Sequence, residues 1–130
     1  MLKYQTSSAI VAVSDLDRAR RFYRDMLGLE VVEDDGEMVI VLRTGATHLV
    51  IYVSAEAGTN RANAAVWTVG EGIEAIVADL KAKGVAFEHY HDMEGLMLDG
   101  DIHRAGDLKL VWLKDPDGNI PHLNTMPAAA

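Results

Sequence analysis

Two histidines occupy matching places in the chain. His48 lies in "THL" at residues 47–49 and His122 lies in "PHL" at residues 121–123, each within a short apolar run. An imidazole nitrogen can bind a divalent metal, and it can also orient a ligand by hydrogen bonding. A catalytic metal site needs about three protein ligands and an open position for water or substrate. The pair therefore raises two alternatives, a metal centre or the wall of a binding pocket.

A second histidine cluster competes with this pair. In "EHYHD", residues 88–92, His89 and His91 lie two apart and so on one face of a strand, with Asp92 beside them. This arrangement is that of a surface metal site or of an exposed polar strand end, and we favour the strand end. His103 is expected in a polar loop. The chain has no cysteine, no G-x-S-x-G elbow, no phosphate-binding loop and no dinucleotide glycine fingerprint.

Composition narrows the classes of function. The chain has 130 residues, of which 49% are hydrophobic and 25% charged, and we expect one domain over residues 1–130. The net charge of −8 argues against a nucleic-acid partner, because phosphate recognition needs a basic face. The apolar run near the N-terminus is too short for a signal peptide or a membrane span. We expect a cytoplasmic protein with no membrane partner.

The residues before position 54 predict a β-α-β-β-β order. Helical spacing of Leu16, Phe22, Tyr23 and their neighbours predicts a helix over 15–27, with Ser14 as N-cap and Asp17 three residues on. Strands are predicted at 9–13, 29–33, 37–43 and 48–53. We define unit one as residues 5–53.

A small-residue stretch at 54–63 is expected to be a linker, after which the order starts again. Unit two, residues 64–125, predicts a helix over 72–83 and strands at 64–69, 85–90, 108–114 and 120–124. The last two strands form a hairpin around "DPDG". Pro116 suits the second position of a type I turn, and Gly118 suits a positive φ.

The two units form an internal repeat with a period near 57 residues: Leu16 matches Ile73, and Gly28 matches Gly84 with one gap. One such unit cannot bury both faces of its sheet. The sequence therefore predicts an α+β fold in which two tandem β-α-β-β-β units pair into a cupped mixed sheet with the helices outside. The concave surface is the expected place of function.

With the repeat in hand, "VSDLDRARRFYRDMLGLEVV" and "WLKDPDGN" resemble the signature of the vicinal oxygen chelate superfamily, which includes glyoxalase I, extradiol dioxygenases and the fosfomycin- and bleomycin-resistance proteins. The resemblance covers nearly the whole chain. It implies the paired glyoxalase/bleomycin-resistance fold and a homodimer. It leaves the chemistry open, because the superfamily holds both metal enzymes and metal-free binding proteins.

Metal-dependent members of that superfamily take one ligand from each of four strands. By position, the resemblance places these ligands at Ser8, at Ala64 or Asn63, at His48 and at His122. Only the two histidines are good ligands, so His48 and His122 remain weak metal candidates and no metal cofactor is expected. Zinc, iron, manganese or nickel is the alternative if a third ligand exists.

Strand alternation sorts the residues that would line the cup. If His48 faces the cup, then Val50 and Tyr52 do so as well. Trp67 and Trp112 are candidates, although packing against a helix is the commoner fate of a tryptophan in a strand. The full set of expected ligand-binding residues is Ser8, Ile10, His48, Val50, Tyr52, Trp67, Tyr90, Met93, Leu96, Met97, Trp112 and His122.

The three residues Met93, Leu96 and Met97 come from a long segment, 91–107, that mixes apolar side chains with glycines and acids. Apolar residues in such a segment must be buried somewhere or form an exposed patch. The segment is either a flap that contacts an apolar ligand or an edge strand involved in dimer packing. We weigh these two alternatives evenly.

Two functions stay open. The first is a metal-independent protein that sequesters a hydrophobic or aromatic small molecule such as an antibiotic. The second is a metal-dependent enzyme, a glyoxalase-type lyase or an extradiol dioxygenase. We favour the first, because Ser8 and Ala64 stand where a metal enzyme needs ligands. The identity of the ligand does not follow from the sequence.

Overall fold

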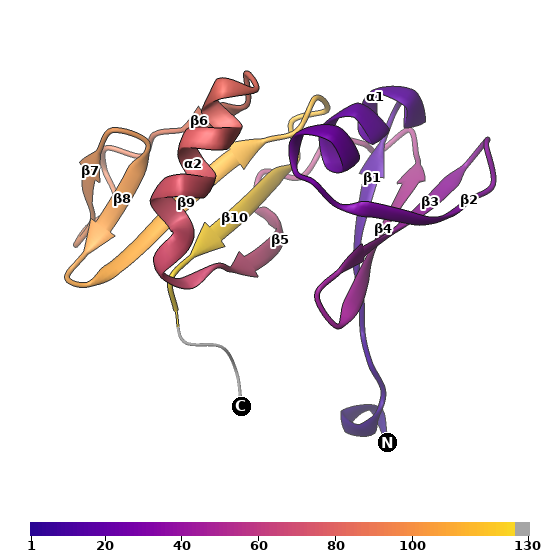
Figure 1. Ribbon diagram of the computed structural model, residues 1–130, viewed down its shortest axis with the longest axis horizontal. Coiled ribbons are helices and arrows are strands. Elements are labelled where there is room, and N and C mark those ends of the chain that lie inside the picture. Colours follow the sequence, from indigo (N-terminus) through magenta and orange to yellow (C-terminus); the bar gives the residue numbers. More distant parts are fainter. Residues whose placement is uncertain (127–130) are drawn as a thin grey trace.

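A computed structural model describes residues 1–126 and places the two units side by side (Figure 1). A short 3-10 turn, Leu2–Tyr4, precedes the first sheet, and the residues before β1 project away from the body. Sheet one has the strand order β1-β4-β3-β2, with β1 parallel to β4 and the other pairs antiparallel. Its strands are β1 (Ala9–Val13), β2 (Glu30–Asp34), β3 (Val39–Thr44) and β4 (Thr47–Val53).

Sheet two repeats this plan and adds to it. Its order is β5-β10-β9-β8-β7, β5 is parallel to β10, and β6 also pairs with β9. Its strands are β5 (Asn63–Thr68), β6 (Ala86–Glu88), β7 (Met97–Asp99), β8 (Ile102–Ala105), β9 (Leu108–Lys114) and β10 (Ile120–Asn124). The parallel pairs β1/β4 and β5/β10 occupy equivalent places, so the predicted repeat and the α+β fold class are confirmed.

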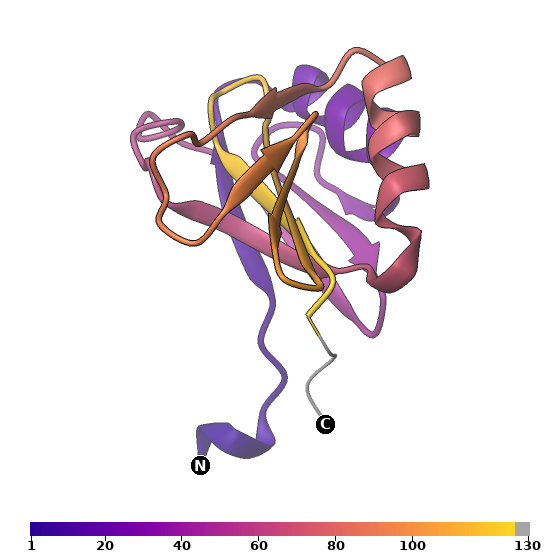
Figure 2. The ribbon, with the colours of Figure 1, turned by 90° about the vertical axis from the view of Figure 1, so that its left-hand side faces the viewer.

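Both helices lie on the same side of the sheets (Figure 2). In unit one, α1 (Leu16–Arg20) continues as a π-helical turn, Arg21–Met26; in unit two, a 3-10 turn, Gly70–Gly72, leads into α2 (Ile73–Ala82). These positions confirm the helices predicted at 15–27 and 72–83. The apolar face of each helix covers its own sheet, and the core includes Val11, Phe22, Leu49, Ile51, Ile73, Leu80, Val111 and Leu123. In residues 1–126, no helix has the length and apolarity needed to cross a bilayer.

The cap of α1 differs from the predicted one. Asp15, not Ser14, is the N-cap: its carboxylate accepts a hydrogen bond from the backbone N–H of Arg18 at 3.1 Å. Ser14 is drawn the other way, toward unit two, where its N–H and hydroxyl donate to Asp117 at 3.0 and 2.6 Å. The prediction was wrong because a long-range carboxylate competes for the Ser14 donors.

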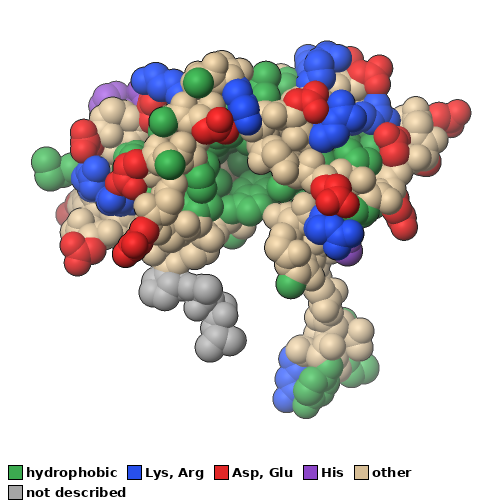
Figure 3. Space-filling model, viewed as in Figure 1, with side chains coloured by type: hydrophobic (Ala, Val, Ile, Leu, Met, Phe, Trp, Pro, Cys, Tyr) green, Lys and Arg blue, Asp and Glu red, His purple; other side chains and the backbone are tan. Residues whose placement is uncertain are grey.

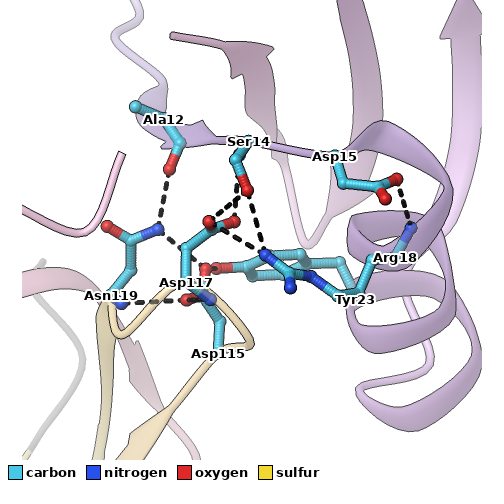
Figure 4. A network of polar contacts seen from close by, with 8 residues as sticks. All are labelled: Ala12, Ser14, Asp15, Arg18, Tyr23, Asp115, Asp117 and Asn119. Carbon is cyan, nitrogen blue, oxygen red and sulfur yellow. Dashed lines mark hydrogen bonds and ion pairs between the residues drawn. The ribbon is translucent and has the colours of Figure 1, made fainter. Parts of the chain in front are cut away.

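That contact belongs to a network that joins the two units, which we call the clasp (Figure 4). In it, Arg18 also donates to Asp117, and the Tyr23 hydroxyl donates to buried Asp115 at 2.7 Å. The clasp consists of Ser14, Arg18, Tyr23, Asp115, Asp117 and Asn119. The two most recognisable sequence motifs are therefore the two halves of one contact between the units.

The "DPDG" turn has the predicted geometry. Gly118 has φ +90°, and its N–H donates to the Asp115 carbonyl at 3.0 Å. The Asp115 carboxylate accepts bonds from the backbone N–H groups of Asp117 and Asn119, which hold the turn closed. The Asn119 amide then reaches unit one and donates to the Ala12 carbonyl at 2.8 Å.

The stretch between the units packs tightly on this turn. Gly58 has φ +75°, and a Cβ atom added there would lie 2.1 Å from the carbonyl oxygen of Asp117. Only glycine fits both the backbone conformation and the space. Residues 54–63 are thus a connection in contact with unit two at Gly58.

The apolar segment after β6 forms the β7–β8 hairpin. β8 pairs with β9 through His103↔Leu110, which extends the edge of sheet two, and β7 pairs with β8. Unit two therefore carries an insertion that unit one lacks. Of the two readings of 91–107, the structure supports the edge strand.

Candidate functional site

On the face of sheet one away from the helices, five predicted residues lie together. β1 and β4 pair in register, with Ile10 opposite Val50 and Ala12 opposite Tyr52. Core side chains such as Val11 and Ile51 alternate with this set and point toward α1. Ile10 keeps 62% of its surface exposed. The concave face of unit one is open, and it carries Ser8, Ile10, His48, Val50 and Tyr52.

The same face of sheet two is filled by its own side chains. The rings of Trp112 and His122 stack with centroids 4.7 Å apart, and Tyr90 packs edge-on against Trp112 at 5.2 Å. His103, on the inserted hairpin, completes the group edge-on to Trp112 at 4.9 Å and is fully buried. We call Tyr90, His103, Trp112 and His122 the aromatic cluster. Its members leave little room for a ligand.

Hydrogen bonds fix both histidines of the cluster. Nδ1 of His122 lies 2.9 Å from the Val111 carbonyl oxygen, so it carries the proton and donates, and Nε2 lies 3.2 Å from the Asn124 amide nitrogen. His103 Nε2 accepts from the backbone N–H of Tyr90 at 2.9 Å. Burial lowers the pKa of both imidazoles, and in His122 the hydrogen bond to the Val111 carbonyl partly opposes this shift. Both are held in the neutral form.

His103 was expected in a polar loop, and the structure corrects this expectation. The residue lies in β8, and its Nδ1 has no hydrogen-bond partner among the described residues. The short motif "DIHRAG" between glycines is a hairpin signal that would have placed His103 in a strand.

The remaining predicted site residues lie elsewhere. Trp67 pairs with Leu123 in the β5–β10 register, so it faces the helices, and its indole N–H donates to Thr44 at 2.7 Å. Met93 and Met97 are 42% and 75% exposed, and Leu96 is half-buried, all on or near the inserted hairpin. Trp67 borders the pocket beside His48, whereas the structure does not bring Met93, Leu96 or Met97 together with the open face of unit one.

The residues at the four ligand positions do not fit a metal ion. The Ser8 hydroxyl lies 3.2 Å from that of Thr47, Ala64 has no donor, and the Asn63 amide oxygen accepts from the Trp112 indole at 3.0 Å. His48 and His122 lie on different sheets. Within residues 1–126, no group of three or more His, Asp or Glu side chains is arranged to hold a metal.

His89 and His91, the alternative metal-binding pair, have different surroundings. His89 Nε2 lies 2.8 Å from the Asp101 carboxylate, which Lys81 approaches as well at 3.3 Å. His91 and Asp92 are exposed. His89 is thus part of a surface ion-pair group.

A small pocket opens where the two units meet at His48. Its volume is about 280 Å³, and it is bounded by Thr47 and His48 from unit one and by Val66 and Thr68 from unit two. Val66 is 60% exposed. Neither Val66 nor Thr68 was predicted as a site residue, although alternation from Trp67 along β5 would have placed both on the concave face.

Comparisons with known proteins agree with this fold. Residues 9–44 match the family described as "Bleomycin resistance protein-like N-terminal". A lactoylglutathione lyase from Agrobacterium tumefaciens is 20% identical with a TM-score of 0.68, over 92% of this chain and 91% of that chain. A glyoxalase/bleomycin resistance protein/dioxygenase from Alicyclobacillus acidocaldarius is 20% identical with a TM-score of 0.67, over 95% and 96%.

The fosfomycin resistance protein FosX from Mesorhizobium loti is 13% identical with a TM-score of 0.65, over 94% of this chain and 92% of that chain. No curated protein matches the chain. The predicted glyoxalase/bleomycin-resistance fold is confirmed.

Proposed function

We propose that this protein, which has the vicinal oxygen chelate fold, is a metal-independent binding protein that sequesters a hydrophobic or aromatic small molecule such as an antibiotic. The observation that carries the proposal is the state of the four ligand positions. Asn63 and His122 are hydrogen-bonded within the protein, and Ser8 and Ala64 are poor ligands or none. A metal enzyme of this fold needs about three free ligands converging on one point.

The open face of unit one supports the binding half of the proposal. Ile10, Val50 and Tyr52 offer an apolar wall, and His48 stands at its end beside the pocket shared with unit two. Burial of apolar ligand area contributes roughly 25 cal/mol per Å² before ordering costs, so ~300 Å² gives a gross ~7 kcal/mol. On that scale, micromolar binding is reachable without a metal.

A second copy of the chain is the proposed partner. Ile10 and Val66 are both more than half exposed on the concave side, and a monomer gains nothing from leaving them in water. A homodimer that covers this side would deepen the shallow wall into an enclosed site. Size-exclusion chromatography with light scattering at micromolar concentration should give twice the monomer mass of 14.2 kDa.

The test combines binding with metal analysis. Protein purified without added metal should carry well under one equivalent of divalent ion, and planar aromatic compounds, with bleomycin among them, should bind by calorimetry and be recovered unchanged. Tyr52→Ala should weaken binding more than His122→Gln, because His122 is committed to Val111 and Asn124. Stoichiometric zinc, iron, manganese or nickel, or a chemically altered ligand, would instead support a lyase or dioxygenase.

A further inference from the structure

The concave face of unit one has an apolar part, which β3 and β4 form together. Val39 lies opposite Tyr52 in their antiparallel register. Val41 lies opposite Val50, and Ile10 on β1 extends the apolar part on the other side of Val50. These side chains span three adjacent strands, a width of roughly 10 Å at the usual strand spacing. The apolar part is therefore wide enough for a flat ligand of a few fused rings.

The same face ends in two side chains that can donate hydrogen bonds. The β3–β4 register places Arg43 directly opposite His48, and Cβ atoms of such a pair lie about 5 Å apart. Leu42, the neighbour of Arg43, is fully buried in the core, so alternation along β3 directs Arg43 to the concave side. Both Arg43 and His48 are exposed. A guanidinium and an imidazole thus lie side by side at one end of the apolar part.

Arg43 is only loosely engaged by the protein. Its Nε lies 3.8 Å from the Glu30 carboxylate, beyond hydrogen-bond distance, and both side chains are more than half exposed. An exposed ion pair of this kind contributes little to stability, so a better-placed anion can replace it. A second carboxylate, Glu33, lies opposite Val41 on the outer strand β2. Arg43 and His48 therefore lie between the apolar part and an acidic edge of the sheet.

A second apolar hollow lies on the helix side, between the two halves of the molecule (Figure 3). Lys83 at this hollow is paired with Asp79 at 3.0 Å and donates to the Met26 carbonyl oxygen at 3.3 Å. Its ammonium group is therefore engaged, whereas Glu30 does not hold Arg43 at hydrogen-bond distance. An apolar wall beside a loosely paired cation is a feature of the concave face.

We propose that the concave face of unit one binds a planar aromatic molecule with one oxyanion, a carboxylate in the simplest case, which pairs with Arg43 and His48. The inference rests on the binding function proposed above and names the class of its ligand. The rings lie on Val41, Val50 and Tyr52. A guanidinium fork pairs well with a carboxylate, and an imidazole donates an N–H in both its neutral and its charged form. The apolar part supplies contact area, and the two donors fix the orientation.

Three naphthalene derivatives that differ in one group test the charge preference. The anionic 2-naphthoate, the neutral 2-naphthamide and the cationic 2-naphthylmethylamine are titrated into the full chain by calorimetry at neutral pH. We expect 2-naphthoate to bind about three- to tenfold more tightly than the amide, and the amine to bind most weakly. Equal binding of the first two, or tightest binding of the amine, overturns this inference but not the proposed function. Binding of none of the three up to millimolar concentration overturns both.

Two arginine variants test whether the preference comes from Arg43. Arg43→Gln should weaken 2-naphthoate binding about three- to tenfold and leave 2-naphthamide binding unchanged, because it removes only the ion pair. Arg24→Gln is the matched control, since it removes a similarly exposed cation from the helical segment of the same unit, and it should alter neither affinity. Equal loss of both ligands in Arg43→Gln, or the same loss of 2-naphthoate in Arg24→Gln, overturns the inference.

Two further variants test where the ligand lies. Tyr52→Ala should weaken both ligands, because both rest their rings on the apolar part. His48→Ala should weaken 2-naphthoate more than 2-naphthamide, because the imidazole N–H serves the oxyanion. Unchanged binding of both ligands in Tyr52→Ala overturns the concave face as the site, and with it the proposed function. Unchanged 2-naphthoate binding in His48→Ala overturns the paired oxyanion site alone.

Discussion

Units one and two share a topology but use their concave faces in opposite ways. In unit one the face is open, and Ile10 is 62% exposed. In unit two every residue of β10 is buried, and the aromatic cluster occupies the same face. The physical difference is the insertion after β6, which supplies Tyr90 and His103 to cover Trp112 and His122. Unit two buries its concave face and so gains stability, whereas unit one leaves its concave face exposed to solvent.

This division explains why the two matching histidines have different surroundings. His122 is buried, stacked on Trp112 and hydrogen-bonded on both sides. His48, at the equivalent place, is exposed at the mouth of a pocket. Equivalent positions in a repeat therefore do not have to share a role, and each of the following predictions tests that contrast.

The largest effect is expected from removing the centre of the aromatic cluster. Trp112→Ala should lower the free energy of unfolding by about 3–5 kcal/mol, because it leaves a cavity and an unpaired Asn63 amide oxygen. Urea unfolding followed by circular dichroism measures it. Tyr52→Ala, an aromatic change on the open face of unit one, is the control and should cost far less. Equal losses would break the contrast between the two faces.

The next effect concerns the clasp, on which both units depend. Asp115→Ala removes the acceptor of Tyr23, Asn119 and the backbone of the turn, and leaves these buried donors unpaired. We expect a loss of about 2–4 kcal/mol. Both units should still unfold in one transition, monitored by calorimetry. The exposed Asp25→Ala should be nearly neutral, and separate melting of the two units would contradict a shared dependence.

A pH effect of intermediate size should come from unit two. Burial lowers the pKa of His103 and of His122, so the unfolded chain binds more protons than the folded one below the ordinary histidine pKa of about 6.5. The free energy of unfolding should therefore fall as the pH is lowered from 7 to 5. His122→Gln should flatten this dependence, whereas His48→Gln, which replaces an exposed histidine, should retain it.

The smallest effect on stability is expected on the open face. Ile10→Ser should change the free energy of unfolding by no more than about 0.5 kcal/mol in the monomer, because the side chain is already mostly in water. The same substitution should weaken binding of planar aromatic compounds in calorimetry. A large loss of stability without any change in binding would show that this face is buried for structural reasons.

The repeat was readable from the sequence because its signals are local. Helical spacing around Phe22 and Ile73, and the "DPDG" turn, place the main elements within a residue or two. The hydrogen bonds of Ser14 could not be predicted from the sequence, because their acceptor Asp117 is 103 residues away. The faces of the two tryptophans were also ambiguous, because alternation gives opposite faces but not which face meets a helix.

The candidate site was predictable only for unit one. Alternation along β1 and β4 correctly grouped Ile10, Val50 and Tyr52. In unit two, His122 was expected on the concave face and Trp112 was only a candidate for it, and alternation could not indicate that Tyr90 and His103 would cover both. The strand that carries His103 could be read from "DIHRAG", but the sheet face that this strand covers is set by tertiary packing, which no short pattern encodes.

The seam between the two sheets is fastened at both of its ends. The clasp joins the units at one end, and the Trp67–Thr44 bond joins them at the other, while β1 and β5 run side by side without sharing a ladder. Two contacts that lie along one line oppose sliding of one sheet along the other but leave rotation about that line free. Rotation about that line would change the angle between the helical segments of the two units, whereas sliding along it would break both contacts.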